Sequence, residues 1–429
     1  MGKRVAAIVV IYIFSTIAWA VLGGTIMART YSTGSALGPR VASTWGSAQS
    51  QLPPAATYTV VSYRDAESLE DGKKVVRKVE VKEERALSLD ATRADVRLNL
   101  EPRQKGLLWY STYKVAFQAT YTFAALQGTE PERITIRFPF PAAQALYDDL
   151  VMSVDGMPIP VTSEGGGAPQ GGAASAAAIT GHTMLVPGRP LVIDVRYRSQ
   201  GLDTWRYDFG GTTGTVAQVR DFKMKMRTSF DDIDFPDNTL SPTSKVLIEK
   251  GWELEWDYQN LVSGYAIAMA MPEKLQPGPL AGRISFFAPV SLFFFFFVML
   301  LITTLRRIDL HPVNYFFLAA AFFAFHLLLA YLVDHIDIHV AFVISSAVSL
   351  ALVVSYLRLV VGMRFAAVEA GLTQFLYLVL FSYAFFFKGF TGLTVTIGAI
   401  LTLFVAMQLT GRIKWSERLA SPAPATTRS

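Results

Sequence analysis

The chain has 429 residues, of which 52% are hydrophobic and only 17% are charged, so it is less charged than an ordinary soluble domain. Its formal charge of +5 is modest and no basic patch with interleaved aromatic residues stands out, which argues against nucleic acid as a partner. The absence of cysteine excludes disulfides, thiolate catalysis and cysteine-ligated metals. The apolar residues concentrate towards the two ends of the chain, which indicates membrane-spanning segments there.

Six apolar segments are long enough to cross a bilayer, because a helix needs about 20 apolar residues to span a hydrocarbon core of about 30 Å. The first lies near the N-terminus, at residues 5–28. The other five follow the middle of the chain, at residues 284–305, 313–333, 338–357, 366–387 and 391–411. We therefore predict six transmembrane helices.

The first segment has an alternative interpretation as a secretory signal peptide. A basic N-terminus precedes the apolar run, and Ala18-Trp19-Ala20 resembles a cleavage site. Apolar residues continue to Met27, however, whereas the apolar region of a signal peptide is usually only about 7–15 residues long. An uncleaved anchor is therefore the favoured interpretation.

Basic residues predict the orientation, because short cytoplasmic loops retain Lys and Arg. With six spans, every connection rich in basic residues falls on the same side as the N-terminus. The basic residues on that side are Lys3, Arg4, Arg306, Arg307, Arg358, Arg364, Arg412, Lys414 and Arg418. Both termini are therefore expected in the cytoplasm, and the domain after the first span outside it.

The segment between the first span and the other five alternates apolar and polar residues, a period of two that is typical of half-buried strands. From Tyr113 to Phe123, for example, Lys114 and Gln118 lie between apolar or aromatic residues. Five stretches follow this pattern, at residues 113–123, 134–140, 191–198, 222–227 and 252–258. No convincing helix separates them, so we predict an all-β, sandwich-like domain of antiparallel sheets.

The sequence thus predicts a membrane helical bundle with an all-β domain inserted between its first and second helices. The predicted parts are a transmembrane anchor over residues 1–28, a linker over 29–56, an extracytoplasmic β-rich domain over 57–283, a five-helix transmembrane bundle over 284–411 and a cytoplasmic tail over 412–429. Within the linker we expect a short helix around residues 41–51. Residues 421–429 are too poor in apolar residues to fold and predict a disordered end.

Local signals refine the β-rich domain. Asp155-Gly156, between two strand-like runs, predicts a tight hairpin turn. Pro158 and Pro160 predict that the following strand lies at a sheet edge, because proline cannot donate a hydrogen bond to the ladder. The low-complexity residues 165–178 predict a mobile loop.

Six stretches are similar in order and spacing to the motifs of one family. They are Trp45-Gly46 with Gln49, the run Arg103 to Tyr110 that leads into Tyr113, Gly251-Trp252 with Trp256, His311-Pro312-Val313-Asn314-Tyr315, Asp334-His335-Ile336, and MQLTGRIKW at residues 407–415. With these motifs the chain resembles the CreD-type inner-membrane proteins of Gram-negative bacteria. The resemblance implies a role in envelope stress or envelope integrity, with no established biochemical activity.

Two stretches depart from that family's pattern. Lys388-Gly389-Phe390 stands where the family has an acidic pair before the last span. Leu52-Pro53-Pro54 stands where the family has Gly-Pro. If the acidic pair is functional in the family, that function is in doubt for this chain.

Five polar residues of the C-terminal bundle are candidate functional residues: His326, Asp334, His335, His339 and Glu369. His335 and His339 are four residues apart, which would place them on one helical face beside Asp334. Such an arrangement could bind a divalent metal ion or serve as a proton-binding site. The simpler interpretation is a polar turn at the outer interface, with Asp334 or Asp337 near the start of the next helix. We favour the simpler interpretation, so no metal is expected.

His326 lies near the middle of its span, where an ionisable residue is costly and faces the bundle interior by default. The favoured interpretation is a neutral imidazole whose hydrogen-bond partner is a serine of the next span. The candidate serines are Ser345, Ser346 and Ser349. Glu369 lies in the first turn of its span, where the helix N-terminus stabilises a carboxylate, so an interfacial position is favoured over a proton relay.

No catalytic signature is present in the sequence. Asp231, Asp232, Asp234 and Asp237 offer hard oxygen ligands, but they lack the glycine and the distant glutamate of an EF-hand, so a solvated acidic loop is favoured. The motifs of zinc proteases and serine hydrolases are missing. We therefore predict a protein that is not an enzyme and that uses no cofactor.

Two functions of different classes remain open. The first is a non-enzymatic envelope protein that senses or scaffolds through its outer β-domain, with the bilayer and other envelope proteins, or a second copy of the chain, as partners. The alternative is a transporter or channel-like protein with a polar path through the bundle, on which His326 or Glu369 would lie. A water-accessible cavity lined by these residues would favour the alternative.

Overall fold

The computed structural model describes residues 2–70, 73–105, 108–143, 145–164, 178–210, 217–387 and 389–411. The chain forms two compact units, a helical one with Met1–Ser35 and Leu275–Ser429 and a β-rich one with Ala36–Lys105 and Trp109–Lys274. The predicted loop at 165–178, apart from its last residue, and the predicted tail at 412–429 lie outside the described residues, as does Lys388.

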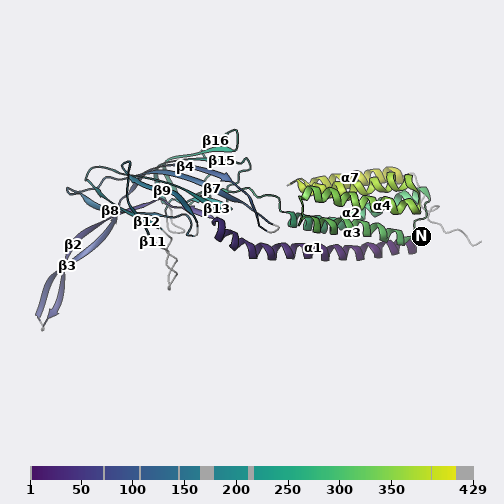
Figure 1. Ribbon diagram of the computed structural model, residues 1–429, viewed down its shortest axis with the longest axis horizontal. Coiled ribbons are helices and arrows are strands. Elements are labelled where there is room, and N and C mark those ends of the chain that lie inside the picture. Colours follow the sequence, from purple (N-terminus) through teal and green to yellow (C-terminus); the bar gives the residue numbers. More distant parts are fainter. Residues whose placement is uncertain are drawn as a thin grey trace, which may run out of the picture. The chain divides into compact units, whose positions relative to one another are not determined.

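Six helical segments of the described chain are long and apolar enough to cross a membrane, which confirms the predicted membrane helices (Figure 1). They are α1 Gly2–Trp45, α2 Pro277–Arg306, α3 Pro312–Leu332, α4 Ile338–Val360, a fifth span from Phe365 to Phe386, and α7 Thr391–Thr410. The fifth span is assembled from η1 Phe365–Ala370, α5 Gly371–Gln374, η2 Phe375–Leu380, α6 Phe381–Tyr383 and η3 Ala384–Phe386. Both η1 and η2 are π-helical turns, which are rare and frequently occur at functional sites.

Helix α1 is longer than predicted. It continues without a break to Trp45 and includes Pro39, so most of the predicted linker is helical and a separate helix at 41–51 is wrong. The polar residues of this stretch do not interrupt the helix, because their hydroxyls donate to backbone carbonyls three or four residues earlier. These residues are Ser32, Ser35, Ser43 and Thr44.

The helical unit is held together by an aromatic core. The rings of Phe295 on α2 and Phe322 on α3 lie 4.6 Å apart between centroids, and both side chains are fully buried. Trp19 of α1 is also buried and lies 5.7 Å from the Phe323 ring. Helices in a bilayer associate by close packing of this kind rather than by the hydrophobic effect.

All of the described strands lie between α1 and α2 in the sequence, and nearly all of their residues belong to the β-rich unit. The strands are β1 Gln49–Gln51, β2 Ala55–Glu70, β3 Lys73–Ala86, β4 Leu89–Leu100, β5 Arg103–Lys105, β6 Leu108–Tyr110, β7 Thr112–Phe123, β8 Glu132–Pro139, β9 Tyr147–Val154, β10 Met157–Pro158, β11 Val161–Glu164, β12 Ala178–Leu185, β13 Leu191–Leu202, β14 Thr204–Tyr207, β15 Ala217–Thr228, β16 Ser244–Leu247, β17 Trp252–Ser263 and β18 Ile267–Ala270. The predicted β-rich domain is thereby confirmed as a β-structure.

The largest sheet has eight strands in the order β10-β9-β13-β7-β4-β15-β17-β16. A five-stranded sheet has the order β11-β12-β8-β2-β3, and a three-stranded sheet has the order β1-β14-β18. One hydrophobic core contains residues of all three sheets, among them Phe117, Ile136 and Trp205. The strands therefore position their apolar faces around a common interior and leave their polar faces to solvent.

Most strand pairs are antiparallel, as predicted, but two are parallel: β4 with β15 and β1 with β14. Period-two alternation indicates which face a residue occupies and not the direction of the neighbouring strand, so these parallel pairs could not be predicted from it. Asp155 and Gly156 have φ angles of 49° and 79° and connect β9 to β10, as the hairpin prediction requires. Strand β10 lies at the edge of the eight-stranded sheet, where Pro158 was expected.

Candidate functional site

The exposed face of the eight-stranded sheet gathers charged side chains from β9, β13, β4, β15 and β17, and β7 adds the polar Gln118 between them. Strand pairing aligns them in rows, since residues directly opposite each other point to the same side of a sheet. The central row consists of Arg196 on β13, Gln118 on β7, Asp95 on β4, Lys225 on β15 and Glu255 on β17. We call this row, together with Arg97, Asp149, Arg198, Lys223, Arg227, Glu253 and Asp257, the charged face.

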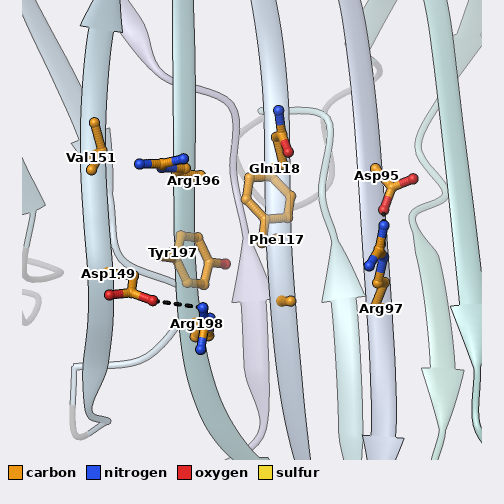
Figure 2. A pocket seen from close by; sticks show the side chains of 10 residues that line it. Asp95, Arg97, Phe117, Gln118, Asp149, Val151, Arg196, Tyr197 and Arg198 are labelled. Atoms are coloured by element: carbon orange, nitrogen blue, oxygen red, sulfur yellow. Dashed lines mark ion pairs between the residues drawn. The ribbon is translucent and has the colours of Figure 1, made fainter. Parts of the chain in front are cut away.

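One half of the charged face surrounds a hollow of about 400 Å³ (Figure 2). Arg198 pairs with Asp149 of β9 at 2.9 Å between Nη2 and Oδ2. Arg97 lies 3.5 Å from Asp95 on its own strand, and Arg196 forms no ion pair with any described residue. Three arginines therefore face two carboxylates here, which leaves an excess of positive charge.

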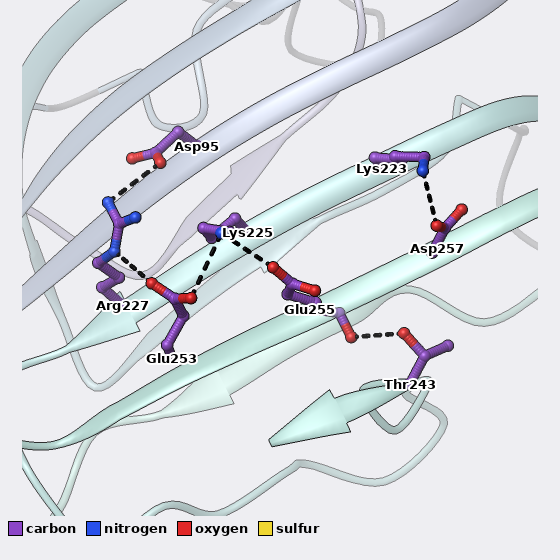
Figure 3. Close-up of polar contacts among 8 residues, drawn as sticks. All are labelled: Asp95, Lys223, Lys225, Arg227, Thr243, Glu253, Glu255 and Asp257. Atoms are coloured by element: carbon purple, nitrogen blue, oxygen red, sulfur yellow. Dashed lines mark hydrogen bonds and ion pairs between the residues drawn. The ribbon is translucent and has the colours of Figure 1, made fainter. Parts of the chain in front are cut away.

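The other half borders a hollow of about 550 Å³ and is filled by a network of ion pairs (Figure 3). Arg227 contacts Glu253 at 2.7 Å and Asp95 at 3.3 Å, and so connects three strands. Lys225 lies 2.9 Å from Glu255 and 3.3 Å from Glu253. The hydrogen bond from Arg227 is the main cause that lowers the pKa of Glu253 below its ordinary value. The charged side chains of this half are therefore paired with opposite charges.

The charged face rests on aromatic residues on the buried side of the same strands. Phe117 and Tyr197 stack at 5.1 Å between ring centroids, and Tyr197 donates a 2.6 Å hydrogen bond to the buried Oε1 of Gln51. Burial is the largest cause that raises the pKa of Tyr197, so its phenol remains a proton donor at neutral pH. The guanidinium groups of Arg97, Arg196 and Arg198 therefore project from a rigid layer. Guanidinium groups held in this way are suited to binding carboxylate or phosphate groups.

Two of the motifs that carry the family resemblance contact each other at the start of the β-rich unit. The Arg103 guanidinium lies 3.6 Å from the centroid of the Trp45 ring, a cation–π contact. Gln49, which is 1% exposed, donates from Nε2 to Ser199 Oγ and to the Gln200 carbonyl, both at 2.9 Å. These motif residues therefore fix the chain that follows α1 against β13.

Among the residues predicted from the sequence, His326 lies in the interior of the helical unit. Its side chain is 1% exposed and its ring lies 5.6 Å from that of Trp19. Its Nδ1 is 2.9 Å from the Phe322 carbonyl of its own helix, whereas Nε2 has no hydrogen-bond partner among the described residues. The expected serine partner from α4 is therefore wrong, because the preceding turn of α3 already offers a carbonyl.

Asp334, His335 and His339 do not form a metal site. Asp334 forms an ion pair with Arg29 of α1, at 2.9 Å between Nη1 and Oδ2. His335 precedes α4, so the one-face geometry expected for a helix does not apply, and the His339 ring lies 4.8 Å from that of Phe386. Within the described chain no group of three or more His, Asp or Glu side chains is arranged to hold a metal ion.

Asp337 is the residue that caps α4, accepting a 2.8 Å hydrogen bond from the backbone N–H of His339. Glu369, in the π-helical turn η1, forms an ion pair with Arg306 at the end of α2. Its Oε2 is buried and has no hydrogen-bond partner in the described part of the chain. Glu369 thus lies in the first turn of its span and also connects that span to α2.

Sequence reasoning missed one buried contact in the bundle. Gln374 is fully buried in the fifth span and donates from Nε2 to Ser349 Oγ of α4 at 2.8 Å. Ser349 in turn donates to the Ala321 carbonyl of α3 at 2.7 Å. The three spans are therefore joined by one chain of hydrogen bonds. A lone glutamine in a long apolar segment was the available signal.

Comparison with known proteins gives one family match. The model of the family described as inner membrane protein CreD matches residues 215–416. No curated protein matches the chain.

Among solved structures, a candidate nutrient binding protein of Legionella pneumophila is 12% identical, with a TM-score of 0.31 over 49% of this chain and 73% of its own. An M1 zinc metallopeptidase of Deinococcus radiodurans is 12% identical, with a TM-score of 0.26 over 43% of this chain and 42% of its own. Both TM-scores are too low to support an argument. The family match covers the last strands and the five C-terminal membrane helices, so over residues 215–416 this chain is similar to inner membrane protein CreD, in agreement with the resemblance of its motifs.

Proposed function

We propose that this protein is a non-enzymatic component of the bacterial inner membrane that supports envelope integrity through a periplasmic β-sandwich. In this proposal the helical unit anchors the chain, and the charged face scaffolds or senses an envelope component. The observation that carries it is the charged face, in which Arg196 has no ion-pair partner among the described residues.

The position of the β-rich unit follows from the distribution of basic residues. Arg306 and Arg307 end the second span and Arg358 ends the fourth, on the side that the N-terminus shares if all six helices cross the membrane. Both termini then lie in the cytoplasm and the charged face lies in the periplasm. The similarity of residues 215–416 to inner membrane protein CreD supports this location.

A transport function is the second candidate, and specific features of the bundle favour it. The fifth span contains two π-helical turns, and the buried polar atoms Gln374 Oε1, Ser345 Oγ and Ser382 Oγ have no partner among the described residues. His326, however, is enclosed by aromatic rings at 4.8 and 5.6 Å, which is the environment of a packed side chain. We therefore place the envelope role first.

A complementation experiment tests the proposal. A strain that lacks the protein is expected to admit a fluorescent dye that intact envelopes exclude, and the wild-type chain should restore exclusion. The variant Arg196→Glu with Arg198→Glu should fail to restore it at equal protein level, because the sign of the charge at the hollow is reversed. The matched control, Lys78→Glu with Lys82→Glu on the exposed β3, should restore it fully.

Two results would contradict the proposal. Full restoration of dye exclusion by the Arg196→Glu, Arg198→Glu variant would show that the function does not depend on the charged face. Loss of function in His326→Gln and Glu369→Gln at normal protein level, with the charged-face variant still active, would favour transport through the bundle instead.

A further inference from the structure

A pocket lies within the helical unit, where α1 and α3 begin and α2 ends. It has a volume of about 440 Å³ and is lined by Arg4, Val5, Ile8, Leu300, Thr303, Thr304, Arg307, Ile308, Asp309, Leu310 and Tyr315. Helix α2 has 30 residues and is therefore about 45 Å long, more than the hydrocarbon core requires. Because α2 is longer than the core and ends at this pocket with Arg306 and Arg307, which are costly within hydrocarbon, we expect this end at the level of the lipid headgroups.

The polar part of the pocket carries two arginines and one carboxylate. Arg4 contacts Asp309 at 2.6 Å and also donates to the Leu310 carbonyl, so its position is fixed. Arg307 is exposed and forms no ion pair with any described residue. The pocket therefore has a net positive charge and one guanidinium free to bind an anion, and Arg matches the geometry of phosphate oxygens.

The backbone holds Arg307 in an unusual conformation. Its φ angle is 54°, in the left-handed region, where it caps α2 by donating from its N–H to the last carbonyls of the helix. Non-glycine residues adopt this conformation at a cost and are worth examining for function. Here the conformation ends the helix and leaves the Arg307 side chain at the edge of the pocket.

The remaining wall is apolar. Val5, Ile8 and Leu300 continue the lining towards the hydrocarbon region. Tyr315 is 1% exposed, and its ring closes this wall of the pocket.

We propose that this pocket binds the phosphodiester headgroup of an anionic phospholipid. Arg307 and Arg4 would contact the phosphate, and Val5, Ile8 and Leu300 would contact the part of an acyl chain next to the headgroup. A soluble phosphate would satisfy the arginines equally but would leave the apolar wall in contact with water. Basic pockets between transmembrane helices are known to suit lipid headgroups of this charge. The proposal is independent of the function assigned to the charged face.

Native mass spectrometry of the full-length protein in detergent tests the proposal, with added phosphatidylglycerol as the probe. The wild-type protein should retain one phosphatidylglycerol in preference to zwitterionic phosphatidylethanolamine. Arg307→Gln should reduce the retained fraction at least about fivefold, the effect of removing one hydrogen-bonding contact to a charged group. The control Arg358→Gln removes an exposed charge from the end of α4, outside the pocket lining, and should leave retention unchanged.

Val5→Trp provides a second variant that fills the apolar wall without altering charge. It should also reduce retention, and unchanged thermal unfolding in detergent will show that each variant is folded. Equal loss in Arg307→Gln and Arg358→Gln would overturn the proposal in favour of unspecific charge attraction. Displacement of the lipid by millimolar inorganic phosphate, with unchanged retention in Val5→Trp, would overturn it in favour of a soluble anion.

Discussion

Arg29 on α1 and Asp334 after α3 form a two-point ion pair in the helical unit. Their Nη1–Oδ2 and Nη2–Oδ1 distances are 2.9 and 3.2 Å, and Arg29 Nη2 lies 3.4 Å from the Ala330 carbonyl. The Asp334 side chain is only 16% exposed, so water screens the pair incompletely. The pair joins the first span to the C-terminal spans across 305 residues of sequence.

Breaking this ion pair should destabilise the helical unit. Arg29→Gln and Asp334→Asn should each lower the midpoint of thermal unfolding of the full-length protein in detergent. The double variant should lose no more than either single variant, with a coupling energy of about 1 kcal/mol in a double-mutant cycle. Arg40→Gln, at an exposed position further along α1, should have no effect. Additive losses would show that the two residues act separately.

Gly46 is expected to tolerate no side chain. Its φ angle is 98°, and a Cβ atom would lie 2.2 Å from the Gln200 carbonyl oxygen. Gly46→Ala should therefore lower the free energy of unfolding by at least about 1–3 kcal/mol, the usual cost of such backbone strain. Gly38→Ala in α1 is the control, because a Cβ there meets no atom within 4 Å. It should be neutral or stabilising, and equal losses in the two variants would contradict the argument.

The charged face should contribute to stability in a pH-dependent way through Glu253. Its pKa is lowered, mainly by the hydrogen bond from Arg227, so its contribution is present above the ordinary value of 4.5 and is lost as the pH falls through the folded-state pKa. Glu253→Gln should lower the unfolding midpoint at pH 7, and its difference from the wild type should shrink as the pH falls below 4.5. Glu249→Gln, at an exposed position, should track the wild type throughout.

Substitution of His326 distinguishes packing from proton relay. His326→Gln and His326→Leu should both accumulate in the membrane and restore dye exclusion. The leucine variant should remain within about 1 kcal/mol of the wild type in stability, because it removes a buried Nε2 that has no partner among the described residues. Loss of function in both variants with normal protein levels would indicate a relay and would support the transport alternative.

The orientation can be tested with reporter fusions. An alkaline phosphatase inserted at residue 170 should be active, because that enzyme folds only outside the cytoplasm. The same reporter placed after Trp415 should be inactive, and a fluorescent protein there should fold. An active phosphatase at the C-terminal position would require an odd number of spans and would exclude the six-helix topology.

The sequence was most informative where a physical requirement acts on consecutive residues. A bilayer demands about 20 apolar residues in a row, so the spans could be located closely: the fourth was expected at 338–357 and is Ile338–Val360. Alternation likewise located the long strands, such as β7. The end of α1 was misjudged because serine and threonine suggest a loop, whereas their hydroxyls here bond to the helix itself.

The candidate site could not be located in the same way. Gln118, Arg196 and Lys225 were recognisable as outward-facing residues of their strands, but nothing in the sequence specified that β13, β7, β4 and β15 are neighbours. The charged face depends on that order and register. The partner of Asp334 was missed for a similar reason, since Arg29 lies far away in the sequence and was assigned to a linker.

The parallel pairing of β4 with β15 has a consequence for the order in which the domain is assembled. Arg93 and Asp221, which form an ion pair across these strands, are 128 residues apart, so β4 emerges long before its neighbour exists. Until then the β10-β9-β13-β7-β4 half of the sheet ends in an unpaired strand, a template for association with other chains. The charges along β4 at Arg93, Asp95 and Arg97 oppose such association. Asp95 and Arg97, which belong to the charged face of the finished protein, therefore also protect this open edge while the chain is being synthesised.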